Sequence, residues 1–88
     1  MDIANQIAAQ VSELLSEGVK KFRYKKTDGT ERVAFGTRNL AIVSQQNGPA
    51  MPSRFKTPGP DCVGYFDFVK KQWRSFKPMN FIGFDDYE

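Results

Sequence analysis

The chain contains no histidine and only one cysteine, Cys62, among its 88 residues. Histidine and cysteine are the usual ligands of structural and catalytic zinc, so this composition argues against a zinc site. A single cysteine also leaves no partner for an internal disulfide. We therefore expect a protein that uses no metal or other cofactor and that works in a reducing compartment, the cytoplasm.

Long apolar runs are missing as well. Nowhere do about 18 consecutive apolar residues occur, which is the length that a membrane-spanning helix requires. Near the N-terminus, Asp2 stands where a secretory signal peptide carries positive charge ahead of its apolar stretch. These features predict a protein that is neither membrane-embedded nor exported by a signal peptide.

Residues suited to catalysis are sparse. Without histidine, acid and base chemistry falls to carboxylates, lysines or tyrosines, and the positions of Asp28, Asp61 and Asp67 do not indicate a shared pocket. Cys62 has no histidine to activate it, so we expect a small structural residue rather than a nucleophile. The glycines fall at turns and bends and form no phosphate-binding fingerprint. The chain is predicted not to be an enzyme.

The net charge of +3 hides an uneven distribution. All thirteen Lys and Arg lie within residues 19–77 together with four acids, whereas the two ends of the chain carry three acids each. A basic middle between acidic ends suits polyanions, which bind through phosphate contacts and release counterions. The alternative is that the Lys and Arg side chains only form the solvent face of a small β-protein and protect its edges.

Residues 2–17 are predicted to form a helix. Asp2 is a favourable N-cap, Gly18 can end the helix, and apolar residues recur between them at helical spacing. These apolar residues are Ile3, Ile7, Val11, Leu14 and Leu15. The segment contains no Lys or Arg, so we expect its apolar stripe to pack on a sheet rather than to bind a membrane.

Residues 20–35 are predicted to form a β-hairpin. Two alternating runs flank an Asp-Gly pair at positions 28 and 29, which is a strong hairpin signal. In the first run aromatic residues alternate with Lys and Arg, and in the second Val33 and Phe35 alternate with Arg32 and Ala34. This pattern is typical of a half-buried antiparallel pair.

The spacing of apolar residues divides the rest of the chain into two β segments and a loop between them. The apolar run at residues 40–43 is predicted to continue as a third strand, so that a first β segment spans residues 19–43. Residues 44–61 hold four of the five prolines and predict a long loop. Residues 62–84 predict a second β segment, made of a hairpin and a closing strand, and residues 85–88 an acidic tail. Residues 1–88 thus predict one small domain.

The sequence also resembles a known family. The motif KKTDGTERVAFGTRNL at residues 25–40, together with YFD at 65–67 and WRSFK at 73–77, is similar to the WYL_2 family of small Sm-like or SH3-like β-barrel proteins. The resemblance covers about residues 19–84, with the proline-rich stretch as an addition. It implies a mainly β fold, in which a five-stranded antiparallel barrel follows an N-terminal amphipathic α-helix. It also implies a phage-encoded protein in the host bacterial cytoplasm.

The leading hypothesis for function is a non-enzymatic β-barrel that binds RNA or single-stranded DNA. A small barrel offers aromatic platforms and a basic rim but no recognition helix for a duplex, and related WYL domains are thought to bind nucleic acids through basic side chains. The expected contacts are Lys21, Arg23, Lys25, Arg38, Arg54, Phe55, Lys56 and Arg74. Within the loop, Phe55 either stacks on a base or only fastens the loop to the core.

Two alternatives stay open from the sequence. One is a protein-interaction module that holds and modulates a host protein through its sheet edge or its long loop. The other is a pocket in the mouth of the barrel for a nucleotide-like small molecule. Trp73 either stacks on a base or, as a lone tryptophan in a thin core, anchors the packing.

Overall fold

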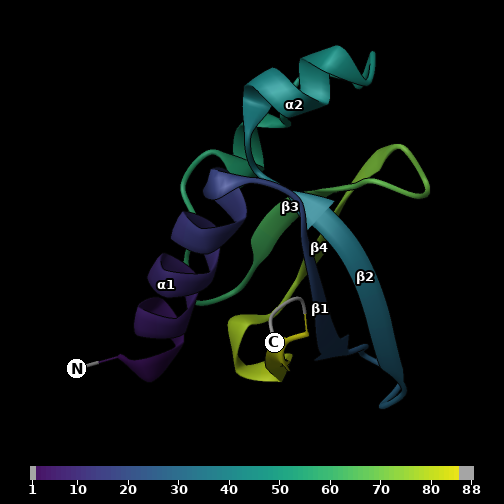
Figure 1. Ribbon diagram of the computed structural model, residues 1–88. Coiled ribbons are helices and arrows are strands. Elements are labelled where there is room, and N and C mark those ends of the chain that lie inside the picture. The colour runs from purple at the N-terminus through teal and green to yellow at the C-terminus, as the bar shows by residue number, and fades with distance from the viewer. Residues whose placement is uncertain (1, 86–88) are drawn as a thin grey trace.

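Within residues 2–85, which the computed structural model describes, five antiparallel strands form one sheet in the order β4-β3-β2-β1-β5. The strands are β1 Lys20–Lys25, β2 Glu31–Thr37, β3 Val63–Asp67, β4 Gln72–Phe76 and β5 Phe81–Phe84. Two α-helices and two 3-10 helices accompany them: α1 Ile3–Glu17, α2 Leu40–Gln45, η1 Ser53–Phe55 and η2 Pro78–Asn80 (Figure 1). The prediction of a mainly β domain with an N-terminal helix and a closing strand that pairs with β1 is confirmed. Of the predicted acidic tail, residues 86–88 lie outside the described residues.

Helix α1 covers one face of the sheet. Asp2 caps it as predicted, because its side chain accepts a hydrogen bond from the backbone nitrogen of Ala4 at 3.0 Å. The helix ends before Gly18. Its carbonyl end is then tied to the sheet: the Leu15 carbonyl accepts hydrogen bonds from the Thr37 hydroxyl at 2.9 Å and from the Arg38 backbone nitrogen at 2.8 Å. These bonds satisfy carbonyl groups that a helix leaves unpaired at its end.

The buried stripe of α1 is rotated relative to the predicted one. Val11 and Leu15 are buried as expected, but Ile3 and Leu14 are exposed. Ala4 and Ala8 are buried in their place. Small side chains let the helix approach the sheet closely, and the larger apolar residues then lie at its margin.

The hairpin of β1 and β2 forms with the predicted turn. Its register places Phe22 opposite Ala34 and Arg23 opposite Val33. Phe22 and Ala34 face the core, whereas Val33 and Phe35 lie on the outer face and are 49% and 42% exposed. The inner position opposite a large phenylalanine ring thus holds the small residue of the second strand.

The prediction of a strand at residues 40–43 is wrong, because α2 begins there. Strand β2 ends at Thr37, and the next residue but one, Asn39, is a helix N-cap whose side chain accepts a hydrogen bond from the Ile42 backbone nitrogen at 3.2 Å. A short apolar run fits a helix or a strand equally well by composition, and the cap decides between them.

This cap yields a prediction for stability. Replacing Asn39 by alanine removes the acceptor for Ile42 and the hydrogen bond from the Asn39 amide to the Ser16 carbonyl, so we expect the free energy of unfolding to fall by about 1 kcal/mol. Urea denaturation measures the change. Asn39→Asp keeps the capping acceptor, so its free energy of unfolding should fall clearly less than that of Asn39→Ala. An equal fall in the two variants would contradict a capping role.

Strand β3 is buried along its whole length because both of its faces are covered. On one face Tyr65 joins the main core with α1 and Phe22. On the other face Phe66 packs against Trp73, with 5.8 Å between the ring centroids, and lies near Val43 of α2 across Gly48. The Trp73 indole nitrogen donates to the Pro49 carbonyl at 2.9 Å. Trp73 thus anchors the segment after α2 to the sheet.

Candidate functional site

The two hairpins of the sheet diverge toward one end of the molecule. Strands β1 and β2 pair along their length, and so do β3 and β4. Between the hairpins, however, the pairing within residues 2–85 is short: Gly36 and Thr37 of β2 pair with Asp67 and Phe66 of β3, and the Phe68 backbone nitrogen donates to the Phe35 carbonyl at 2.7 Å. The start of β2 therefore separates from β3 and β4. A cavity of about 380 Å³ opens there, bounded by both hairpins and by η2.

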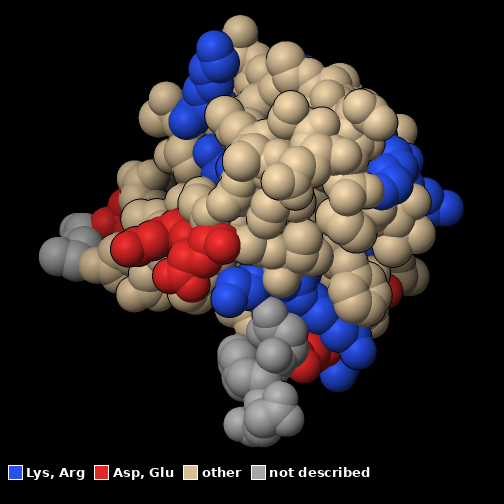
Figure 2. All heavy atoms as spheres, turned by 45° about the horizontal axis from the view of Figure 1, so that its top comes forward, with Lys and Arg blue, Asp and Glu red and all other residues tan. Residues whose placement is uncertain are grey.

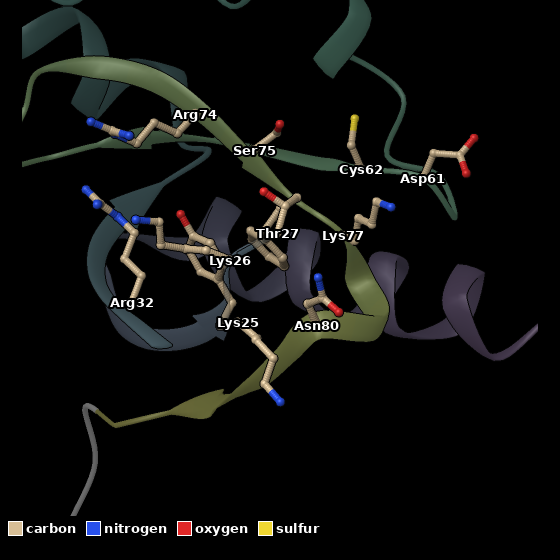
Figure 3. A pocket seen from close by; sticks show the side chains of 12 residues that line it. Lys25, Lys26, Thr27, Arg32, Asp61, Cys62, Arg74, Ser75, Lys77 and Asn80 are labelled. Atoms are coloured by element: carbon tan, nitrogen blue, oxygen red, sulfur yellow. The ribbon is translucent and has the colours of Figure 1, made fainter. Parts of the chain in front are cut away.

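Cationic side chains dominate the lining of this cavity, which we call the basic cavity (Figure 3). Its cations are Lys25, Lys26, Arg32, Arg74 and Lys77. Among the described residues that line it, Asp61 is the one carboxylate. Figure 3 shows the nitrogen ends of Lys26, Arg32 and Arg74 on the same side of the cavity in this view, whereas the Lys25 side chain points away from them.

A buried carboxylate fixes the two arginines of the cavity. One oxygen of Asp67 accepts a hydrogen bond from the Arg32 guanidinium at 3.0 Å and lies 3.2 Å from Arg74 Nε. Its other oxygen accepts from the backbone nitrogens of Val69 and Lys70 at 3.0 and 2.9 Å. Asp67 is 2% exposed. Both guanidinium groups are therefore held in place before any ligand arrives.

The same contacts set the charge state of this cluster. Burial alone would raise the pKa of Asp67, but the hydrogen bonds from the Lys70 backbone and from Arg32 outweigh it, and the pKa lies below its ordinary value. For Arg32, burial alone would lower the pKa, and the hydrogen bond to Asp67 raises it instead. Asp67 is thus a carboxylate and Arg32 a cation at any physiological pH.

The inner wall of the basic cavity is aromatic. The ring of Tyr24 stacks on that of Phe76, with 4.9 Å between the centroids. The hydroxyl groups of Tyr24 and Tyr65 lie 2.9 Å apart and form a buried hydrogen bond. Burial, and then this hydrogen bond, raise the pKa of Tyr65, so its hydroxyl stays neutral. Tyr24 and Phe76 are each 5% exposed, so the cavity joins fixed cations to the uncharged edge of the aromatic core.

Comparison with protein families identifies the fold. The family described as WYL_2, Sm-like SH3 beta-barrel fold, matches residues 8–82. The chain belongs to the WYL_2 family. The resemblance noted in the sequence is thereby confirmed, and the match extends across both hairpins and most of α1. A search of curated proteins and a search of solved structures found no match.

The residues predicted as contacts do not form one surface of this WYL_2 protein. Lys25 and Arg74 line the basic cavity. Lys21 and Arg23 lie elsewhere, on the outward side of β1, and Arg23 forms ion pairs with Glu31 at 3.0 Å and with Asp85. These two ion pairs also raise the pKa of Arg23, and the hydrogen bond that Arg23 donates to the Asp85 carboxylate is the largest contribution.

Two further predicted contacts are buried. Phe55 is 2% exposed, because its ring lies against Gly64 and faces Trp73 at 6.3 Å between centroids, so it fastens the loop to the core. Arg38 is 8% exposed and donates to the carbonyls of Gly64 and Phe55 at 2.7 and 3.0 Å. The Phe55 ring is therefore not free to stack on a base, and two donors of the Arg38 guanidinium are engaged by backbone carbonyls away from the basic cavity.

The remaining predicted contacts, Arg54 and Lys56, flank Phe55 on the outside of the molecule. The Arg54 guanidinium lies 4.5 Å from the centre of the Phe55 ring, and neither residue lines the basic cavity within the described part of the chain.

Sequence reasoning missed three cations of the cavity: Lys26, Arg32 and Lys77. Arg32 carried a usable signal. It lies two residues before the buried Ala34 and so shares the inward side of β2, where an arginine requires a charged partner. Lys26 and Lys77 follow directly on the ends of β1 and β4, and only the arrangement of the hairpins brings them together.

No helix within residues 2–85 is long and apolar enough to cross a membrane.

Proposed function

We propose that this WYL_2 protein is a non-enzymatic binding module that holds RNA or single-stranded DNA in the basic cavity. The observation that supports this function is the cluster of five Lys and Arg side chains around one concave site, two of which are fixed by a buried carboxylate. A guanidinium held in position loses less entropy when it binds a phosphate, and clustered cations gain from counterion release.

Different side chains of the cavity suit different parts of a nucleotide. Arg32 and Arg74 present fixed N–H groups for a phosphate. Lys26 and Lys77 are exposed and flexible and contact neighbouring phosphates along the strand. Tyr24 and Phe76 offer an apolar wall for a sugar or base. A volume of about 380 Å³ admits one nucleotide at a time and no duplex, which favours a single strand.

The assignment as a binding module rather than an enzyme rests on the fold and on the state of the carboxylates. The Sm-like SH3 fold is typical of non-catalytic binding modules. Asp67 is engaged on both oxygens, which leaves it unsuited to act as a general base. A phage origin and a place in the host cytoplasm are part of this proposal and rest on the family resemblance.

An NMR titration tests the proposal. Labelled protein is titrated with a ten-nucleotide RNA and with DNA of the same sequence, at low and at moderate salt. We expect saturable shifts at the backbone amides of residues 24–27 and 73–77, with affinity that falls steeply as salt rises. An unchanged spectrum at low salt would overturn the proposal and would leave a protein partner as the better hypothesis.

Two matched double variants locate the binding surface. We expect Lys26→Ala with Lys77→Ala to weaken RNA binding about tenfold at moderate salt, because each lysine contributes a phosphate contact. All four residues of the two variants are exposed, so the fold should tolerate both changes. Arg54→Ala with Lys56→Ala removes the same charge from the loop and should change the affinity less than twofold. A larger loss from the loop variant would place the interface there instead.

A further inference from the structure

Residues 39–53 contain no Lys, Arg, Asp or Glu, although 26% of the chain is charged. This stretch comprises the N-cap of α2, the helix itself and the segment that leads into η1. In Figure 2 the end of the molecule that carries α2 is turned toward the viewer, and a broad uncharged surface covers it, with Lys and Arg at its margin and Asp or Glu at its left edge. Such a surface is unlike the charged exterior of the rest of the protein and resembles the centre of a protein interface.

The uncharged surface is hollowed into a groove. Two cavities of about 540 and 520 Å³ lie side by side and share Leu40, Ala50 and Met51 as a common wall. We call these two adjoining hollows together the α2 groove. Leu40, at its centre, is 56% exposed. The first cavity is closed by Ser44, Asn47 and residues 48–49, so that one arm of the groove is neutral and partly polar.

The other arm of the α2 groove ends in two cations, Arg38 and Lys56, and no carboxylate lines it among the described residues. Arg38 is buried, yet its hydrogen bonds run to backbone carbonyls alone, and within residues 2–85 no carboxylate forms an ion pair with it. Burial accordingly lowers the pKa of Arg38. Arg32 and Arg74, by contrast, both form ion pairs with the carboxylate of Asp67.

A buried cation without a counter-charge is costly, and an anion in the adjoining cavity would reduce that cost. Two carbonyl hydrogen bonds also use only part of the five N–H donors of a guanidinium. The exposed Lys56 lies at the same end of the groove and adds a second positive charge. The anion that fits must carry an uncharged body, because the rest of the groove is neutral and largely apolar.

We propose that the α2 groove binds the free C-terminal end of a partner protein whose last residues are uncharged and apolar. The terminal carboxylate lies at Arg38 and Lys56, the last side chain packs on Leu40 and Met51, and the preceding peptide groups meet Ser44 and Asn47 in the neutral arm. Those polar side chains favour a peptide over a plain hydrocarbon acid, which has no backbone groups to bond. The α2 groove and the basic cavity share no lining residue, so this inference is independent of nucleic-acid binding.

Fluorescence polarisation tests the groove with the full chain. The probe is a fluorescein-labelled peptide, Gly-Ser-Gly-Ser-Val-Leu, with a free carboxylate, and the matched probe is the same peptide with a C-terminal amide. We expect saturable binding of the acid and a loss of about tenfold or more on amidation, because a charge-assisted hydrogen bond is removed. Equal binding of the two peptides, or binding of neither, would overturn the proposal.

Two substitutions connect the signal to the groove. Lys56→Gln should weaken binding of the acid peptide about fivefold, and Leu40→Asp, which places a negative charge beside the carboxylate, about tenfold or more. Both positions are exposed, and thermal unfolding checks that the fold is kept. Lys70→Gln removes a lysine outside both sites and should leave peptide binding unchanged. If Lys70→Gln and Lys56→Gln weaken peptide binding equally, the net charge of the protein causes the effect, and the assignment to the α2 groove is overturned.

Competition with decanoate distinguishes a site for a peptide C-terminus from a site for a small apolar acid. We expect it to compete with the peptide only weakly, because it lacks groups for the neutral arm. Tight binding of decanoate with no binding of the peptide would overturn the assignment to a protein C-terminus. Binding of the ten-nucleotide RNA, measured on the same variants, should be unaffected by Lys56→Gln, so the two proposals fail or hold separately.

Discussion

Replacing Asp67 by asparagine is expected to lower the free energy of unfolding by about 3 kcal/mol, a large part of the stability of a small domain. The carboxylate is 2% exposed and is the shared partner of Arg32 and Arg74, so its loss leaves two half-buried guanidinium groups without a counter-charge. The amide of asparagine keeps the volume and an acceptor for the turn after β3. Urea denaturation at neutral pH measures the effect.

The pH dependence of the same variant identifies charge as the cause. The pKa of Asp67 in the folded protein lies below its ordinary value of 3.8. Its contribution is therefore fully present above that ordinary value and is lost as the pH falls through the lowered folded-state pKa. The gap in stability between the wild type and Asp67→Asn should be constant near neutral pH and should narrow in acid. A gap that persists unchanged in acid would contradict an ionic origin.

Asp61→Asn is the matched control. Asp61 also lies beside the basic cavity, but it is exposed, so its substitution should change the free energy of unfolding by no more than about 0.5 kcal/mol. Because Asp67 orients both arginines, Asp67→Asn should also weaken RNA binding in the fraction that stays folded, whereas Asp61→Asn, which removes a negative charge near the phosphate, should not.

The elements that sequence predicts well are those in which neighbours along the chain decide the structure. The first hairpin follows from an Asp-Gly turn between two alternating runs, and α1 follows from its cap and its 3.6-residue period. It is harder to predict from sequence which face of a strand or helix is buried. The alternating pattern of β2 would be the same with Val33 or with Ala34 on the inner face. Ala34 faces inward because it lies opposite the large buried ring of Phe22.

The candidate sites required contacts that no local pattern contains. Asp67 meets Arg32 from 35 residues away, and the basic cavity exists only because β2 and β3 pair over a short stretch. The error at α2 has a similar origin. Residues 40–43 would suit a strand, but the chain leaves the sheet after Thr37, which is bound to the end of α1, and Asn39 then starts a helix. Tertiary contacts thus override an ambiguous local preference.

Replacing Gly64 by alanine is expected to lower the free energy of unfolding by about 3 kcal/mol. A β-carbon at this position would lie 2.6 Å from Cβ of Phe55 and closer still to Cγ of its ring. These atoms are near the backbone of η1 rather than at the tip of a flexible side chain, so the clash forces η1 away from the sheet. Urea denaturation measures the loss, and fluorescence of Trp73, which faces Phe55, reports the movement.

A double-mutant cycle tests the cause of that loss. Phe55→Ala alone should cost about 3 kcal/mol, because it empties a buried site. In the double variant the contacts of the new methyl group with the ring are gone and its 2.6 Å contact with Cβ of residue 55 remains, so the combined loss should be below the sum of the two single losses. Additive losses would show that the ring of Phe55 is not the cause of the loss.

The Gly64→Ala variant also distinguishes the two proposed sites. The carbonyls of Gly64 and Phe55 hold Arg38, so displacement of η1 by Gly64→Ala releases the buried cation at the end of the α2 groove. Peptide binding should then weaken severalfold at a temperature where the variant is still folded. Arg32, Arg74 and Asp67 lie on the other side of this disturbance and keep their contacts, so RNA binding should be retained. If both activities fall together, the variant has lost the fold rather than the groove.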